Sequence, residues 1–255
     1  MAEPLLHVQN LVKRFGGVVA TDNLSLDIAQ GELHAIIGPN GAGKTTLISQ
    51  LIGQLRPSAG TIRFAGEDIT HLPVWKRSRL GLARSFQITS LLPDFTAADN
   101  VALAAQAQDD HSFRFFANAR KEAALREAAH AALKRVGLGD RADVVVSRLS
   151  HGEQRELELA VALATKPQLL LLDEPMAGLG ATESARMVKL LADLRKEVTI
   201  VLVEHDMNAV FALADRITVL VYGRVIASDV PAAIRVNEEV KRAYLGDQHV
   251  VTSHG

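Results

Sequence analysis

The chain has 255 residues, 28 Lys and Arg against 29 Asp and Glu, and no cysteine. This composition excludes disulfides and thiolate metal sites, and the near-neutral charge gives no electrostatic reason to expect nucleic acid as a partner. The N-terminus does not have the pattern of a signal peptide, and no apolar run approaches the roughly 20 residues of a membrane helix. We therefore expect any membrane role to come through a partner.

Apolar runs predict strands in the first quarter of the chain. They are "LLHVQNLV", "LSLDIAQGELHAIIG" and "TIRFAGEDI", which alternate or run apolar in the way of strands. Between the second and third runs, "TTLISQLIGQL" predicts a helix.

A glycine-rich loop joins the second run to that helix. Gly38, Gly43, Lys44 and Thr45 fit the spacing G-x-x-x-x-G-K-[ST], with a strand before it and a helix after it. The glycines let successive backbone N–H groups point at phosphate oxygens, and the helix N-terminus adds partial positive charge. This motif predicts that Lys44 reaches the β- and γ-phosphates and that the Thr45 hydroxyl binds Mg²⁺; the alternative is a plain glycine-rich turn. The expected nucleotide-binding residues here are Gly38, Pro39, Asn40, Gly41, Ala42, Gly43, Lys44, Thr45 and Thr46.

The middle of the chain changes character. In "ARSFQITS", Gln87 follows a short apolar strand, where its amide is a candidate contact for Mg²⁺ or water. The region of about 90–165 is rich in alanine with helical spacing, and Gly137 is suited to end a helix. This region interrupts an alternation of strands and helices, so we expect an inserted helical subdomain.

The segment "SRLSHGEQRELELAVALA" places a polar turn at the start of a helix. Ser150 and the backbone N–H groups of the turn predict a second anion site. Ser150 with Glu153 also predicts a capping box, and the two interpretations are compatible. Because one domain gains little from two phosphate sites, two copies facing each other would clamp each nucleotide between them.

Continuous apolar strands return in "QLLLLDE", "VTIVLVEH" and "RITVLVYG", separated by helices such as residues 181–196. This alternation predicts a parallel sheet covered by helices on both faces. Asp173 ends the first strand and is expected to hold Mg²⁺, directly or through water. Glu174 points the other way in an extended chain and is the candidate general base. The alternative for the acidic pair is a strand-ending acid that caps the next helix. His205, at the end of the second strand, is a candidate ligand of the γ-phosphate, and the alternative is a structural histidine bonded to nearby backbone.

The order "GPNGAGKTT", "SFQ", "LSHGEQ", "LLLLDEP", "MAGLG", "EHD" resembles the ATP-binding cassette of ABC transporters. The resemblance implies a P-loop NTPase fold: a RecA-like parallel sheet with helices on both faces, an N-terminal antiparallel β-subdomain and the helical insertion. It implies a cassette over residues 1–246, a flexible tail over 247–255, and ATP and Mg²⁺ as cofactors. It further implies that Phe15 stacks on adenine, unless this phenylalanine belongs to the core, and that Glu174 is the base.

The same resemblance implies roles across a dimer. Gln87 would contact Mg²⁺ and couple to the membrane partner, His205 would sense the γ-phosphate, and Ser150 and Gly152, with Glu153 beside them, would act on the ATP of the other subunit. Two residues depart from the usual Leu-Ser-Gly-Gly-Gln signature, namely His151 and Glu153, and the aspartate of the D-loop is absent.

Further segments, including "KRFGGVVATDNLSLDI" and "VKRAYLG", resemble importer cassettes for branched-chain amino acids and related polar amides. The implied partners are a second cassette, alike or different, two transmembrane permease subunits and, indirectly, an extracytoplasmic substrate-binding protein. The implied location is the cytoplasmic face of the inner membrane. One alternative is an exporter cassette of the lipopolysaccharide-extraction type. Another is a soluble ABC ATPase of DNA repair or translation, although the chain has no room for a coiled-coil insertion or a second cassette.

Overall fold

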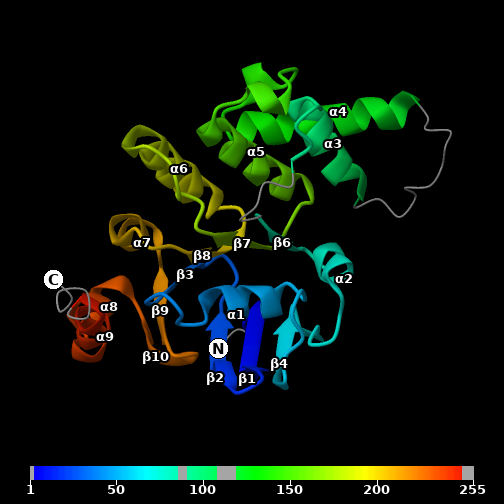
Figure 1. Ribbon diagram of the computed structural model, residues 1–255. Coiled ribbons are helices and arrows are strands. Elements are labelled where there is room, and N and C mark those ends of the chain that lie inside the picture. Colours follow the sequence, from blue (N-terminus) through cyan, green and yellow to red (C-terminus); the bar gives the residue numbers. More distant parts are fainter. Residues whose placement is uncertain (1–2, 86–90, 108–118, 249–255) are drawn as a thin grey trace.

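Two sheets and the helices packed against them make up the protein (Figure 1). The computed structural model describes residues 3–85, 91–107 and 119–248. The antiparallel sheet has the order β2-β1-β4-β5, and the larger sheet has the order β10-β9-β3-β8-β7-β6. All neighbours in the larger sheet pair in parallel except β9 and β10, which are antiparallel. The strands are β1 (Leu6–Phe15), β2 (Val18–Ile28), β3 (Leu33–Ile37), β4 (Ala59–Phe64), β5 (Glu67–Asp68), β6 (Leu82–Arg84), β7 (Leu169–Asp173), β8 (Thr199–Val203), β9 (Arg216–Val221) and β10 (Arg224–Asp229).

Helices cover both faces of the larger sheet (Figure 1). The helix that follows β3 packs between the two sheets, helices from the second half of the chain lie on the opposite face, and the last helices follow β10. A further group caps the molecule beyond α5. The predicted fold class is therefore confirmed. The helices are α1 (Lys44–Leu51), α2 (Val74–Arg79), α3 (Ala97–Ala107), α4 (Ala119–Arg135), α5 (His151–Ala164), α6 (Ala181–Leu194), α7 (Met207–Leu213), α8 (Pro231–Val236) and α9 (Glu238–Gln248).

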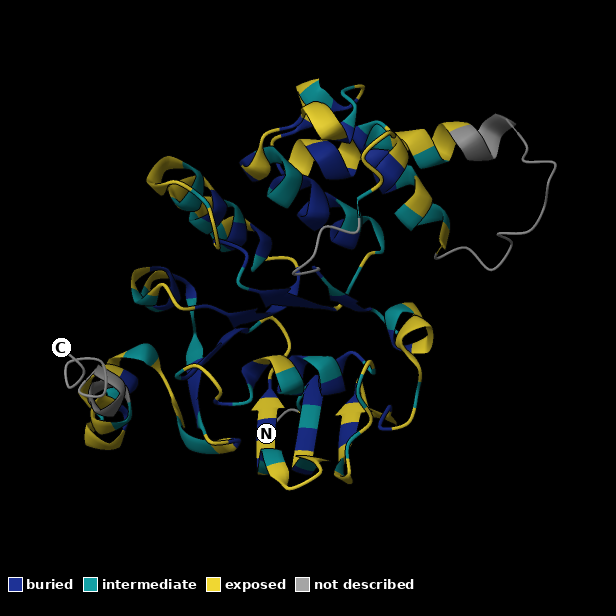
Figure 2. Cartoon of the chain, viewed as in Figure 1, coloured by how far each residue is buried: buried dark blue, intermediate teal, exposed yellow. Residues whose placement is uncertain are grey.

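The strand β7 shows why the sheet is buried on both faces. Its leucines alternate in direction, since successive side chains of a strand point to opposite faces. Leu169 and Leu171 pack with α1 and the antiparallel sheet, while Leu170 and Leu172 pack with α5 and α6. Figure 2 shows the central strands as a buried layer between helices whose outer faces are exposed.

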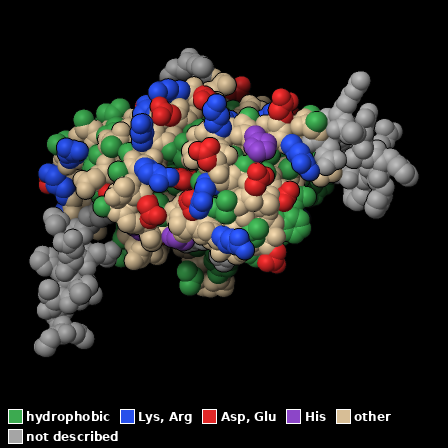
Figure 3. All heavy atoms as spheres, turned by 90° about the horizontal axis from the view of Figure 1, so that it is seen from above, with side chains coloured by type: hydrophobic (Ala, Val, Ile, Leu, Met, Phe, Trp, Pro, Cys, Tyr) green, Lys and Arg blue, Asp and Glu red, His purple; other side chains and the backbone are tan. Residues whose placement is uncertain are grey.

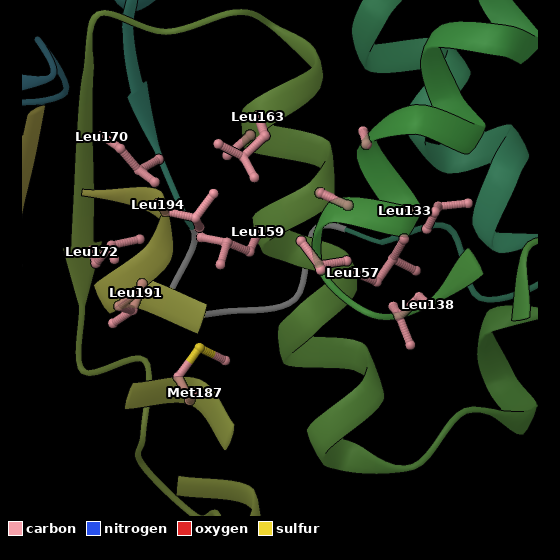
Figure 4. Close-up of a cluster of buried hydrophobic side chains, with 14 of the residues drawn as sticks. Leu133, Leu138, Leu157, Leu159, Leu163, Leu170, Leu172, Met187, Leu191 and Leu194 are labelled. Carbon is pink, nitrogen blue, oxygen red and sulfur yellow. The ribbon is translucent and has the colours of Figure 1, made fainter. Parts of the chain in front are cut away.

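Helix α5 belongs to two packing layers. In Figure 4, Leu157 points toward Leu133 and Leu138 of the helical group, while Leu159 and Leu163 point toward the sheet and α6. Helix α5 therefore connects the helical group to the sheet through buried apolar contacts. Because such interiors are close-packed, the helical group and the sheet resist displacement relative to each other. On the outer face of this part of the molecule, basic and acidic side chains are interspersed without a single-sign area (Figure 3).

The C-terminal segment differs from the sequence prediction. The resemblance implied a flexible tail over residues 247–255. The structure has two helices separated at Asn237, whose backbone is extended (φ −69°, ψ 120°). The Asn237 side chain accepts hydrogen bonds from the N–H groups of Glu239 and Val240 and so caps the second helix. That helix includes residues 247 and 248, which were predicted as tail; residues 249–255 lie outside the described part.

A buried arginine fixes the far end of α1, the helix that begins at the phosphate loop. Arg77 is 1% exposed, and its guanidinium donates to the carbonyl oxygens of Gln50 and Leu51 at the end of α1. It also donates to the carbonyls of Thr70 and Leu72. The carbonyl of Gln50 also accepts from the N–H of Gly53, but that of Leu51 is the last carbonyl of α1, which has no partner within the helix. Burial lowers the pKa of Arg77 to about 10.

We expect Arg77→Ala to lower the free energy of unfolding by about 3 kcal/mol, because it leaves several buried carbonyls without donors. Urea unfolding followed by circular dichroism measures this loss. The matched control is Arg79→Ala on the exposed face of the same helix, with an expected loss below about 1 kcal/mol. Equal losses for the two variants would contradict the anchoring role of Arg77.

Candidate nucleotide-binding site

The glycine-rich loop connects the carboxyl end of β3 to the start of α1, and neighbouring backbone presses against it. A Cβ on Gly38 would lie 2.2 Å from the carbonyl oxygen of Leu220, and one on Gly43 would lie 2.3 Å from that of Ala20. Gly43 also has a φ of +100°, which side chains disfavour. Gly43 precedes α1 and offers no side-chain cap, so the first N–H groups of the helix remain available to an anion.

Lys44 opens α1 and turns its side chain back into the loop. Its ammonium donates to the carbonyl oxygens of Gly38 (2.6 Å) and Pro39 (3.0 Å). Burial lowers the pKa of Lys44, and the charges of Glu174 and Asp173 oppose that shift. The structure therefore places Lys44 within electrostatic reach of both acids. Thr45, the next residue, is exposed at the helix start.

Asp173 ends β7 and is buried. One carboxylate oxygen, Oδ2, accepts a hydrogen bond from Arg84 (2.8 Å), while Oδ1 is buried without a hydrogen-bond partner. Burial raises the pKa of this carboxyl, and the positive charge of Arg84 opposes the shift. An unpaired carboxylate oxygen beside a phosphate loop is the kind of ligand that Mg²⁺ takes.

The donor set fits Mg²⁺ better than a metal held by protein alone. In residues 3–85, 91–107 and 119–248, no group of three or more His, Asp or Glu is arranged to hold a metal ion. Mg²⁺ usually takes one or two protein oxygens and completes its shell with phosphates and water. Asp173 and Thr45 can supply those oxygens, and the third predicted ligand, Gln87, lies outside the described residues.

Glu174 and His205 come together from neighbouring strands. The His205 Nε2 lies 2.9 Å from Glu174 Oε1, which joins the ends of β7 and β8. The sequence analysis assumed an extended backbone at Glu174, and this assumption is wrong. The backbone φ of Glu174 is +52°, a conformation that is rare for residues other than glycine. Its N–H still donates to the carbonyl of Val203 and so continues the ladder with β8. The chain thus turns immediately after Asp173, and this turn, rather than the alternation of a strand, aims Glu174 at His205.

Glu204 is a residue that the sequence analysis missed. Its buried carboxylate accepts from the N–H of Met176 through Oε1 (2.9 Å) and from the N–H of His205 through Oε2 (2.8 Å). It therefore ties the segment after Glu174 to the segment that carries His205. The only signal in the sequence was an acid at the end of an apolar strand, directly before His205.

The turn before α5 forms the predicted capping box. Ser150 Oγ accepts from the N–H of Glu153, and Glu153 accepts from the N–H of Ser150 and from Arg141. Gly152 is buried against α6, since a Cβ there would lie 2.5 Å from Glu183 Oε1. Among the described residues, no hydrogen bond joins this turn to Lys44, Asp173, Glu174 or His205. The structure therefore shows two separate groups of predicted site residues within one chain.

Phe15 lies at the end of β1 and is 48% exposed, so it is not a core phenylalanine. The ammonium of Lys13 lies 5.2 Å from the centre of its ring. An exposed aromatic ring of this kind is available for stacking on a ligand.

The sequence profile of the family described as "ABC transporter" matches residues 21–177, which include the phosphate loop, the capped turn and Asp173. The chain belongs to the ABC transporter ATP-binding cassette family. It is therefore an ATPase with a nucleotide site. A second profile, described as "Branched-chain amino acid ATP-binding cassette transporter", matches residues 224–250 of the cassette.

Whole-length relatives agree. The cassette is 40% identical to the high-affinity branched-chain amino acid transport ATP-binding protein LivG of Escherichia coli K12, over 97% of this chain and 100% of LivG. Its fold matches the ADP conformation of MJ1267, an ATP-binding cassette of an ABC transporter, with a TM-score of 0.85 and 27% identity over 96% of this chain and 100% of that one. A dimeric post-hydrolysis structure of the cassette MJ0796 with ADP and Pi matches with a TM-score of 0.76 and 26% identity, over 89% and 98% of the two chains.

We expect Glu204→Gln to lower kcat for ATP about tenfold with little change in KM, because one acceptor becomes a donor facing a backbone N–H and the Glu174–His205 pair loses its support. Steady-state ATPase kinetics measure both constants. The control is Glu197→Gln, an exposed acid on the surface, with unchanged kinetics expected. A variant at 204 that raised KM alone would contradict the positioning role.

Proposed function

We propose that the cassette drives an importer for branched-chain amino acids or related polar amides. The main support for this proposal is the whole-length similarity to LivG together with the separate match of residues 224–250 to the branched-chain profile. That C-terminal match covers β10, α8 and α9, a part outside the general nucleotide-binding motifs. The exporter and DNA-repair alternatives have no comparable support.

The phosphate side of the site would bind ATP through the loop of residues 38–46. The loop amides and Lys44 would hold the β- and γ-phosphates once the ammonium exchanges the carbonyls of Gly38 and Pro39 for phosphate oxygens. Thr45, Asp173 and Gln87 would hold Mg²⁺, which neutralises charge on the phosphate oxygens. Phe15 would stack on adenine, since its ring is exposed.

Glu174 would act as the general base. Its carboxylate accepts from His205 Nε2, which fixes the hydrogen of the imidazole on that nitrogen. A γ-phosphate oxygen is a second acceptor for the same N–H. When His205 donates to that phosphate, Glu174 Oε1 is free to accept a proton from the attacking water. His205 would thereby couple the presence of γ-phosphate to the availability of the base.

Ser150, Gly152 and Glu153 would act on the nucleotide of a second cassette. The Ser150 oxygen is used as an acceptor within the capping box, so its hydrogen remains for a phosphate oxygen. The turn is exposed at Ser150 and lies apart from this chain's own phosphate loop. The match to a dimeric cassette with ADP and Pi supports such an arrangement. The second cassette would be another copy or a related chain.

A groove between α2, β6, α3 and α5 would receive a membrane subunit. It encloses about 390 Å³ and is lined mainly by apolar side chains, including Val74, Trp75, Leu91 and Val161. Trp75 is 56% exposed, an unusual degree for a large aromatic unless a partner covers it. Among the described residues, no helix is long and apolar enough to cross a membrane. From the similarity to LivG, we assign the crossing to two permease subunits, place the cassette on their cytoplasmic face, and assign recognition of the transported molecule to an extracytoplasmic binding protein.

Two variants separate nucleotide binding from chemistry. We expect Glu174→Gln to bind ATP as the parent does but to lose at least about 100-fold in kcat, because the water loses its base. We expect Lys44→Ala to weaken ATP binding about tenfold or more, because it removes the cation on the phosphates. Equilibrium titration with a fluorescent ATP analogue and a phosphate-release assay measure the two effects. Parental turnover in the first variant would refute the role of Glu174.

Uptake tests the importer assignment. In cells that lack this gene, we expect uptake of labelled leucine, isoleucine or valine to fall to background and to return with the parental gene but not with the Glu174→Gln variant. Uptake of an unrelated sugar serves as the control and stays constant. Unchanged amino-acid uptake, combined with normal ATP hydrolysis by the purified chain, would reject the substrate class and retain the ATPase.

A further inference from the structure

One side chain belongs to both the partner groove and the candidate metal site. Arg84 is the last residue of β6, and it lines the groove together with Trp75 and Val161. The Arg84 guanidinium donates through Nη2 to Asp173 Oδ2 (2.8 Å) and through Nη1 to Gln54 Oε1 (3.1 Å). Gln54 lies beyond the C-terminal end of α1, at the opposite end of this helix from Lys44, so the contact by which Arg84 joins the groove to the nucleotide site is the one with Asp173.

The position of Arg84 is fixed by the sheet. It pairs with Leu171 in the parallel register of β6 and β7, and Ser85 continues the ladder to the carbonyl of Leu171. In this register Arg84 lies beside Leu171, which is two residues before Asp173 at the end of β7, so the Arg84 side chain reaches the Asp173 carboxylate. The Arg84 side chain is 9% exposed and that of Asp173 is 1% exposed, so the pair is shielded from water. A charge-assisted bond in such surroundings is stronger than at a surface.

The bond leaves Asp173 with a defined orientation. Oδ2 is held by Arg84, and Oδ1 is buried without a partner. A carboxylate that binds metal through one oxygen is commonly oriented through the other, and loss of such an outer partner weakens metal binding.

We propose that Arg84 is a positioning residue through which a membrane-partner helix in the groove strengthens the hold of Asp173 on the metal. This inference rests on the proposed function of the groove. An apolar helix seated over Val74, Trp75 and Val161 covers the remaining exposed part of Arg84 and excludes water from its bond to Asp173. Lower local dielectric strengthens that bond and so fixes the carboxylate more firmly. Binding of a helix in the groove thereby changes the metal affinity of Asp173 through the Arg84 side chain.

The first test uses the purified chain and needs no hydrolysis. Mn²⁺ binding is titrated by electron paramagnetic resonance at saturating ADP. We expect Arg84→Gln to weaken Mn²⁺ binding about tenfold, as loss of an outer partner of a metal ligand does. The Mn²⁺ affinity of Arg84→Lys is expected to lie between those of the parent and of Arg84→Gln. Arg79→Gln, a second arginine of the groove that does not contact Asp173, is the matched control with parental Mn²⁺ affinity. ADP affinity in EDTA and the circular dichroism spectrum stay constant in all variants.

The second test fills the groove. Because the chain has no cysteine, Val74→Cys gives a unique site for a bulky aromatic maleimide. We expect labelling to tighten Mn²⁺ binding about threefold or more in the parent background and to have no effect in the Arg84→Gln background. Parental Mn²⁺ affinity in Arg84→Gln would overturn the proposal, as would a label effect that is absent or equal in both backgrounds. Failure of the parent to bind ADP would instead reject the proposed function.

Discussion

Burial of the Asp173 carboxylate is the constraint around which the site is arranged. A charged group at the end of a fully buried strand loses its hydration, and only nearby cations and donors compensate for that loss. Arg84 supplies one hydrogen bond, and the ammonium of Lys44 lies close enough to oppose the shift of its pKa. One oxygen is still without a partner. The uncompensated negative charge is suited to a metal cation, so the burial that destabilises the Asp173 carboxylate also favours cation binding at this position.

The two groups of site residues are rigidly connected although they lie apart. Helix α5 begins at the capped turn of Ser150 and packs one face on the helical group and the other on β7 and α6 (Figure 4). Arg186 of α6 adds an ion pair to Glu156 of α5. A cassette that closed on a second copy would therefore move the Ser150 turn together with the strand that ends in Asp173. Interdigitated leucines transmit such movement because close-packed interiors deform little.

Two departures from the usual family pattern fit one another in space. A Cβ on Gly178 would lie 3.2 Å from His151 Nε2, so the small residue in the D-loop leaves room for the histidine in the signature turn. Gly180, at the position of the missing aspartate, has its N–H bonded by Glu183, which also covers Gly152. In this chain the signature turn therefore contacts both the D-loop and the first turn of α6.

The sequence by itself determined the elements and most of the candidate residues, because glycine spacing, strand-ending acids and apolar periodicity are local patterns. The phosphate loop, the strand ending in Asp173 and the capping box of Ser150 follow from residues within about one element of each other. Only the tertiary structure decided the contacts that join elements: Glu204 between Met176 and His205, Arg84 between the groove and Asp173, and the left-handed turn at Glu174. Such contacts depend on which strands are neighbours and in what register. That order is set by the burial of whole faces of the sheet and not by any single segment.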